Sequence, residues 1–135
     1  MSTKSSPKYV GIDLGTTTTG LAYIRSDGNP EIVPNADGER MTPSVVYFDK
    51  HEDIKLVGSS ARDGGDPDRT IHLIKRHMDN PNYVVEMDGK NWTPTEISAL
   101  ILAKMRRDCS QIIGDIQDVV ITVPARLLIR TGWPS

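Results

Sequence analysis

The sequence predicts an α/β or α+β fold in which helices pack against a mixed β-sheet. Short apolar segments separated by turn-forming residues follow one another through residues 8–33, which is typical of an antiparallel β-meander. Residues 94–113 have the periodicity of a long amphipathic helix. Residues 118–124 follow as an almost continuous run of β-branched residues, which is typical of a central strand covered on both faces. A helix followed by such a strand, after an opening meander, favours a mixed sheet with helices.

The bulk composition limits the chain to one domain-sized unit and excludes several classes of partner. The 135 residues carry a formal net charge of -2, with acidic and basic residues interspersed. We therefore expect no nucleic-acid surface and no basic membrane-binding patch. The single cysteine excludes an internal disulfide framework, and no apolar run has the length of a membrane span or a secretory signal. We expect a cytoplasmic protein, and we interpret residues 1–7 as a disordered tail.

The first hairpin, residues 9–24, is the most informative stretch. Apolar residues alternate along residues 10–14 and resume at residues 21–24, and between them lies a turn of Gly15 and four threonines. Such a turn can direct successive backbone N–H groups onto one point, which creates an anion-binding concavity. The adjacent Asp13 would suit a hydrated Mg²⁺ ion, which proteins hold by one or two carboxylates plus phosphate oxygens. An ordinary hairpin turn has the same composition, so the pattern alone leaves both interpretations open.

Short strands alternate with polar loops in the middle of the chain. Residues 35–44 are dense in turn formers, and their chemistry favours a plain connecting loop that leads to a strand at Val45–Phe48. A brief strand at residues 56–58 precedes a capped helix start at residues 59–62.

A second short helix is expected next. Asp68 or Thr70 can cap it, and it would continue to Met78 before Asn-Pro ends it. Lys75 and Arg76 would lie on this helix, where a solvated face is their ordinary environment.

The last third of the chain has the strongest local signals. Asp88 and Gly89 separate two short strands, which predicts a hairpin with a two-residue type I′ turn. Thr93, Pro94 and Glu96 fulfil the requirements for a capping box, and the helix that follows ends at a Gly.

The long helix separates apolar from polar residues. Its apolar stripe includes Cys109, which we interpret as a packing residue rather than a reactive one. The polar residues, which mostly occupy the other faces, are Lys104, Arg106, Arg107, Asp108 and Gln111.

Other catalytic and metal-binding motifs are missing from the sequence. The three histidines, at positions 51, 72 and 77, do not have metal-ligand spacing. No Gly-x-x-x-x-Gly-Lys-Ser/Thr stretch and no Gly-x-Gly-x-x-Gly stretch occurs, which excludes P-loop and Rossmann phosphate sites.

Four stretches, in order along the chain, resemble the amino-terminal part of the ATPase domain of DnaK-type chaperones, the 70-kDa heat-shock protein family. They are Val10–Thr17, Asn35–Arg40 with Thr42–Phe48, Val57–Arg62 with Ile74–Arg76, and Val119–Ala125. The first stretch alone is shared with actin-like proteins and sugar kinases, whereas the later ones are specific to the chaperones. The resemblance covers residues 9–125 and stops at Arg126.

The resemblance implies an actin-like ATPase fold, related to ribonuclease H, of which the chain would hold the first lobe only. Residues 8–125 would form a partial nucleotide-binding domain. We expect its core subdomain to comprise residues 8–41 and 112–125, and its smaller subdomain to comprise about residues 42–111. Residues 126–135 diverge from the family, as a truncated gene, a shifted reading frame or a genuine short form would.

The resemblance also implies roles for individual residues. Asp13 would hold Mg²⁺ through water molecules, Lys75 would position the attacking water, and Arg76 would support the site. The residues implied in phosphate binding are Gly15, Thr16, Thr17, Thr18 and Arg76, and those implied in catalysis are Thr16 and Lys75. This division fits phosphoryl transfer, in which positioning and charge neutralisation by a metal and cations supply most of the catalysis.

The implied function is binding of ATP and ADP, with Mg²⁺-dependent hydrolysis that drives a stress-responsive protein-folding cycle. Unfolded client proteins, J-domain proteins and nucleotide exchange factors would be the partners of the full-length family. Because the family binds adenine with a second lobe, we expect this chain alone to be inactive and to bind nucleotide weakly. The alternatives are a non-enzymatic fragment that binds co-chaperones or other partners, and a relative of actin or the sugar kinases.

Overall fold

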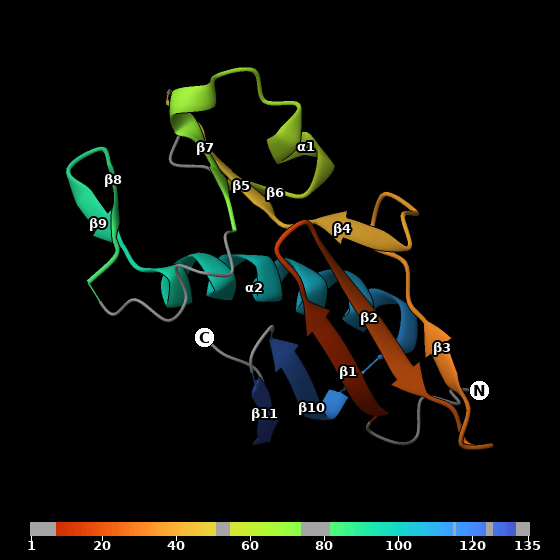
Figure 1. Cartoon of the computed structure of the whole chain (residues 1–135). Helices are drawn as coiled ribbons and strands as arrows, with labels where there is room; N and C mark the ends of the chain where they lie inside the picture. The colour runs from red at the N-terminus through yellow and green to blue at the C-terminus, as the bar shows by residue number, and fades with distance from the viewer. Residues whose placement is uncertain (1–7, 51–54, 74–81, 115, 124–125, 132–135) are drawn as a thin grey trace.

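The computed structural model describes residues 8–50, 55–73, 82–114, 116–123 and 126–131 (Figure 1). The first elements along the chain are β1 (Lys8–Leu14), β2 (Thr18–Ile24), β3 (Pro30–Ile32), β4 (Met41–Pro43), β5 (Val45–Phe48), β6 (Lys55–Val57) and α1 (Ser59–Arg62). The elements that follow are the 3₁₀-helix η1 (Pro67–Arg69), β7 (Thr70–His72), β8 (Val85–Met87), β9 (Lys90–Trp92), α2 (Pro94–Ile113), β10 (Ile116–Val123) and β11 (Arg126–Thr131).

The largest sheet is mixed, as the sequence predicts. Its strands follow the order β11-β10-β1-β2-β3, and β4 also pairs with β2. Strands β1 and β10 run parallel, with Val10 opposite Val119 and Asp13 opposite Thr122, whereas the other pairs are antiparallel. The expected meander of β1, β2 and β3 is therefore confirmed, and α2 lies behind this sheet (Figure 1).

Strands β1 and β10 bury one face against α2 and leave the other face open. Val10, Ile12 and Leu14 of β1 are at most 3% exposed and belong to one core cluster with the apolar stripe of α2. Full burial of each such side chain contributes about 1.5–3 kcal/mol. On the opposite face Tyr9 is 55% exposed and Val120 is 37% exposed. The interpretation of residues 118–124 as a strand covered on both faces is therefore wrong in the described structure.

Two smaller sheets complete the β-structure. Strands β6, β5 and β7 form an antiparallel sheet, and β8 pairs with β9. Asp88 and Gly89 have φ angles of 54° and 83°, so the type I′ turn is confirmed. Arg69 Nη1 donates to Asp88 Oδ1 at 3.0 Å, and its Nε donates to the carbonyl of Phe48. This one side chain therefore joins the hairpin to the three-stranded sheet.

The start of α2 has the predicted capping box. Thr93 Oγ1 accepts from the N–H of Glu96 at 3.1 Å, and Glu96 Oε1 accepts from the N–H of Thr93 at 2.9 Å. Gly114 ends the helix with a φ angle of 83°, which favours glycine.

The expected second helix is replaced by a 3₁₀ turn and a strand. Asp66 caps η1 by accepting from the N–H of Asp68 at 3.0 Å, and β7 then pairs with β5. Ile71 and Leu73 point to the interior and His72 is exposed, which is the two-residue period of a strand. The prediction of a helix is therefore wrong for residues 70–72. The remainder of the expected helix lies outside the described residues.

The segment 35–44 is an ordered structure rather than a plain connector. Met41–Pro43 forms β4, and Asn35 is buried, with its side-chain oxygen accepting from the N–H groups of Asp37 and Glu39 at 2.9 and 3.0 Å. The Asn35 amide donates to Glu39 Oε1 and to Thr42 Oγ1. Every hydrogen-bonding position of this side chain is thus used to hold the loop.

The neighbouring α1 lacks the side-chain cap that the sequence suggests. Its N-cap is Gly58, and Ser59 instead donates its hydroxyl to Glu39 Oε2 at 2.6 Å. The hydroxyl of Ser59 and the amide of Asn35 hold the pKa of Glu39 below its ordinary value.

Two charged residues of α2 are buried, contrary to the expectation that they lie on its outer faces. Lys104 is 8% exposed and Asp108 is 4% exposed, and Lys104 Nζ lies 2.7 Å from Asp108 Oδ2. The same oxygen accepts from the N–H of Ala36 at 2.9 Å. The helix is therefore tied to the loop 35–39 through an ion pair.

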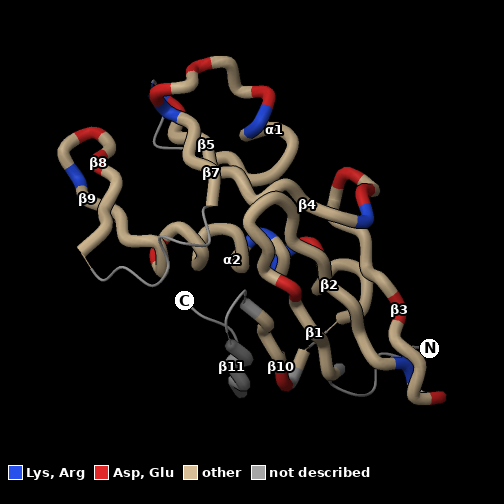
Figure 2. Tube along the Cα trace, viewed as in Figure 1, with Lys and Arg blue, Asp and Glu red and all other residues tan. Residues whose placement is uncertain are grey.

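Charged residues of both signs are spread over the loops and over α2 (Figure 2). Among the described helices, none combines the length and the apolar character that crossing a lipid bilayer requires.

Cys109 should be unreactive in the folded protein. It is 2% exposed within the core, and burial, with a smaller effect of the Asp108 carboxylate, raises its pKa to about 12. Because the thiolate is the reactive form, a disulfide reagent at pH 8 should modify it at least about 100-fold more slowly in native buffer than in urea. A Ser26→Cys variant on a Cys109→Ala background provides the exposed control. Equal rates for Cys109 in both conditions would contradict this prediction.

Stability should fall in acid partly because Glu39 becomes protonated. The pKa of Glu39 in the folded state lies below the unfolded value of 4.5. The stabilisation that its carboxylate contributes is therefore complete above pH 4.5 and is lost as the pH falls through the folded-state pKa. The difference in unfolding free energy between wild type and Glu39→Gln should therefore shrink from pH 6 to pH 3, as measured by urea unfolding. Ser59→Ala removes the main cause of the shift and should move this acid dependence to higher pH. A difference that stays constant with pH would refute the assignment.

Candidate functional site

A tight loop connects β1 to β2 at one end of the large sheet. The N–H of Gly15 donates to the carbonyl of Thr18 at 3.1 Å, which closes the loop across Thr16 and Thr17. A Cβ atom added to Gly15 would lie 2.6 Å from that carbonyl oxygen, closer than real Cβ contacts come. Only glycine fits there because the two backbone segments approach so closely.

The tip of this loop presents unused hydrogen-bond donors. Thr17 is exposed and Thr16 is half-buried. Within the described residues, neither their N–H groups nor their hydroxyls form a hydrogen bond. The carbonyl of Thr17 accepts from the N–H of Ser44 at 2.9 Å, which fastens the loop through its acceptor side. Thr18 is the first residue of β2 and contributes its carbonyl to the loop closure.

Asp13 lies beside the loop near the carboxyl end of β1. Its side chain is exposed, and Oδ1 lies 3.0 Å from the hydroxyl of Thr122 on the parallel neighbour β10. That hydroxyl also lies 3.3 Å from the carbonyl oxygen of Ile12. Thr122 therefore orients the Asp13 carboxylate, and the second oxygen of this carboxylate remains open to solvent. Sequence reasoning missed Thr122, because only the register of β1 with β10 brings it here.

The structure brings together some of the predicted site residues. Asp13, Gly15, Thr16, Thr17 and Thr18 surround the same end of the β1–β2 hairpin. Lys75 and Arg76, predicted to position water and to support the site, lie outside the described residues.

The donor set fits a phosphate group and a hydrated metal ion. Two free N–H groups and two hydroxyls match phosphate oxygens, and an exposed carboxylate suits an ion that keeps most of its water ligands. Among the described residues, no group of three or more His, Cys, Asp or Glu side chains could enclose a metal by itself.

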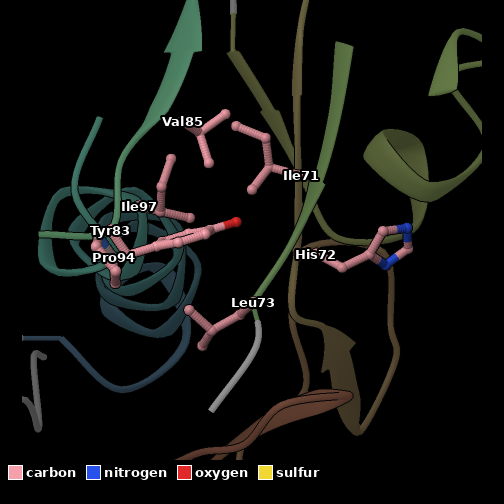
Figure 3. Close-up of a pocket in the computed structure, with 7 residues that line it drawn as sticks. All are labelled: Ile71, His72, Leu73, Tyr83, Val85, Pro94 and Ile97. Carbon is pink, nitrogen blue, oxygen red and sulfur yellow. The ribbon is translucent and has the colours of Figure 1, made fainter. Parts of the chain in front are cut away.

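An apolar pocket lies elsewhere, between the first turn of α2, β7 and the segment before β8 (Figure 3). The residues that line it are Ile71, His72, Leu73, Tyr83, Val85, Pro94 and Ile97. Its volume of about 20 Å³ has room for about one water molecule. In Figure 3 the imidazole of His72 points away from the other labelled side chains. The pocket is too small for a nucleotide and contains no residue of the β1–β2 loop.

Comparison with known proteins shows the family of the chain. The family model described as "Hsp70 protein" matches residues 9–83 and 78–127. The chain is 49% identical over 119 residues to the "Chaperone protein DnaK" of Thermotoga neapolitana, a match that covers 86% of this chain and 20% of the relative. The DnaK proteins of Thermotoga petrophila and Thermotoga maritima match with the same identity and coverage.

These matches place the described structure within a larger protein architecture. The chain spans about a fifth of the length of the curated relatives that it matches. Its mixed sheet and accompanying helices correspond to part of the first lobe of the actin-like ATPase fold. The chain belongs to the Hsp70 family, as part of its DnaK-type ATPase domain.

Proposed function

We propose that the chain is a phosphate-binding lobe of an Hsp70-type ATPase, with the β1–β2 loop as its binding element. The observation that carries this proposal is the closed loop in which Gly15 admits a close backbone contact and Thr16 and Thr17 present free N–H donors beside Asp13. A loop fixed before the ligand arrives loses little conformational freedom on binding, so its donors are preorganised for an anion.

Each residue at the loop has a distinct role in this proposal. The N–H groups and hydroxyls of Thr16 and Thr17 bind terminal phosphate oxygens, and Thr18 supports them through the loop closure. Asp13, oriented by Thr122, holds water ligands of a Mg²⁺ ion. The ion, when bound, neutralises charge on the phosphates. Lys75 positions the attacking water and Arg76 supports the site, as the family resemblance suggests.

The whole-protein function is proposed on the same basis. DnaK-type proteins are named as chaperones, and we infer that this chain derives from a protein that couples ATP hydrolysis to a folding cycle in the cytoplasm. Unfolded clients, J-domain proteins and exchange factors would act on that larger protein. The division into a core subdomain, residues 8–41 with 112–125, and a smaller one, residues 42–111, is part of this proposal.

The isolated chain should bind nucleotide weakly. Asp13 and Thr17 are exposed, so water competes for the phosphate oxygens and screens the charge of the metal. Without a surface that excludes water, hydrolysis by the chain alone should be slight.

A nuclear magnetic resonance titration tests the proposal directly. Mg-ATP added to millimolar concentration should shift the backbone amide signals of Gly15, Thr16 and Thr17, with smaller shifts elsewhere. Tripolyphosphate with Mg²⁺ should reproduce the pattern, whereas adenosine should not, because the loop recognises phosphate. Unmoved loop signals at millimolar Mg-ATP would overturn the proposal and favour the non-enzymatic fragment.

Gly15→Ala should weaken Mg-ATP binding by about tenfold or more, which corresponds to about 1.4 kcal/mol. The added methyl group would meet the Thr18 carbonyl at 2.6 Å, so the loop must open and its donors must diverge. Gly11→Ala is the matched control, because its Cβ would approach nothing closer than 4.0 Å. The same titration measures both variants. Equal weakening by the two substitutions would show that loop closure is not the cause.

Asp13→Asn should remove most of the enhancement of ATP binding by Mg²⁺, because a neutral amide keeps the shape but not the charge that attracts the hydrated ion. The measurement is the ratio of affinities with and without Mg²⁺, which should fall toward one. Asp37→Asn removes an exposed charge from a neighbouring loop and should leave the ratio unchanged. A ratio of affinities that Asp13→Asn does not change would exclude Asp13 as the metal-side carboxylate.

Lys75→Ala should leave binding of Mg-ATP intact while removing most single-turnover hydrolysis.

A further inference from the structure

Ser44 occupies the junction between the two larger sheets. It is the single residue between β4, which pairs with β2 in the large sheet, and β5, which is central in the three-stranded sheet. The residue is 0% exposed. A polar residue at such a point must find its hydrogen-bond partners inside the protein.

All three of its hydrogen-bonding groups have such partners. Its N–H donates to the carbonyl of Thr17 at 2.9 Å, and its carbonyl accepts from the N–H of Leu73 at 2.9 Å. Its hydroxyl lies 2.9 Å from the hydroxyl of Thr19, and either group can be the donor. One buried residue therefore fastens the β1–β2 loop, strand β2 and the end of β7.

The bond to Thr17 affects the geometry of the loop directly. Because the peptide group is planar, fixing the carbonyl of Thr17 fixes the whole peptide plane between Thr17 and Thr18. The Gly15-to-Thr18 bond closes the loop from its other side. With both sides held, the short segment of Thr16 and Thr17 between them has little freedom to turn its N–H groups.

The hydroxyl pair keeps Ser44 in the position from which its N–H reaches Thr17. Thr19 is also 0% exposed, so neither hydroxyl can exchange its partner for water. Loss of one hydroxyl would leave the other buried without a partner, which the backbone can relieve only by moving. Because Ser44 follows β4 and Thr19 lies in β2, such a movement would disturb the pairing of these strands, where Thr18 is opposite Pro43.

We propose that Ser44 is a positioning residue for phosphate binding, which sets the direction of the loop donors through Thr17 and Thr19 without touching the ligand. The inference rests on the proposed function, because it concerns the same loop. It adds a residue that does not contact the ligand and that links the β1–β2 loop to the three-stranded sheet of β5, β6 and β7.

The test compares Ser44→Ala, Thr19→Val and the double variant in the full chain. Ser44→Ala should shift the amide signals of Thr17 and Thr18 and accelerate their hydrogen exchange without any ligand. It should also weaken Mg-tripolyphosphate binding by about tenfold or more, measured by titration of the loop signals. The double variant removes both hydroxyls, so it should recover much of the stability in urea but not the affinity.

Ser98→Ala provides the matched control. Ser98 is a buried serine of α2, 5% exposed, and its hydroxyl has no partner among the described residues. Its substitution should leave the loop signals and the affinity at wild-type values. Affinity that returns together with stability in the double variant would reduce Ser44 to a structural role and overturn the inference.

The ligand-free measurements separate this inference from the proposed function. If wild type binds no phosphate but Ser44→Ala alters Thr17 and Thr18, the function fails while the control of the loop by Ser44 stands. If wild type binds phosphate and Ser44→Ala changes neither loop signals nor affinity, the function stands and the inference fails.

Discussion

The buried ion pair between Lys104 and Asp108 is the polar interaction that joins the long helix α2 to the loop before β4. Both side chains are buried, and Asp108 Oδ2 accepts from Lys104 Nζ and from the N–H of Ala36. Removing one member of a buried pair typically costs about 3–5 kcal/mol, because the other charge remains without compensation. That cost is a large part of the 5–15 kcal/mol by which domains are usually stable. Replacing both members by apolar residues is often tolerated, so the main effect of such a pair is to specify geometry. Here it fixes where the loop 35–39 meets α2.

The β1–β2 loop is connected to this junction through a short series of contacts. Ala36 is held by Asp108, and the adjacent Asn35 uses its side chain to bind Glu39 and Thr42. Thr42 belongs to β4, which pairs with the start of β2, and Ser44 follows directly. These hydrogen bonds are buried or partly buried, and the cost of an unmade bond rises with burial. A polar segment rich in Asn, Asp and Gly is ordered for this reason, and its order extends to the β1–β2 loop.

The sequence predicted the features that local chemistry determines, and it failed where distant pairing decides. The Asp88–Gly89 turn and the Thr93–Glu96 capping box need only a few neighbouring residues, and both are present. Residues 70–72 form a strand because β5 offers an edge, which helical signals within the segment could not reveal. The burial of Lys104 and Asp108 escaped prediction because residue type assigns such side chains to the surface. At the candidate site, Asp13 and the Gly15–Thr17 loop could be found from their pattern, whereas Thr122 and Ser44 reach them only through the register of the sheets.

A fixed loop and an exposed site have opposite effects on binding. The loop lies in a defined conformation before any ligand arrives, so binding would not have to order it, and its two N–H donors already lack an acceptor within the described residues. Exposure acts against this, because Asp13 and Thr17 face water, in which a charge interaction is worth a small fraction of its value in a dry site. The described residues are enough to fix the conformation of the β1–β2 loop. Exclusion of water from the loop requires a further surface that covers this end of the sheet. If the loop binds phosphate as proposed, affinity should therefore be limited by solvent rather than by the geometry of its donors. Any partner surface that covers the loop would strengthen binding without changing a single contact within it.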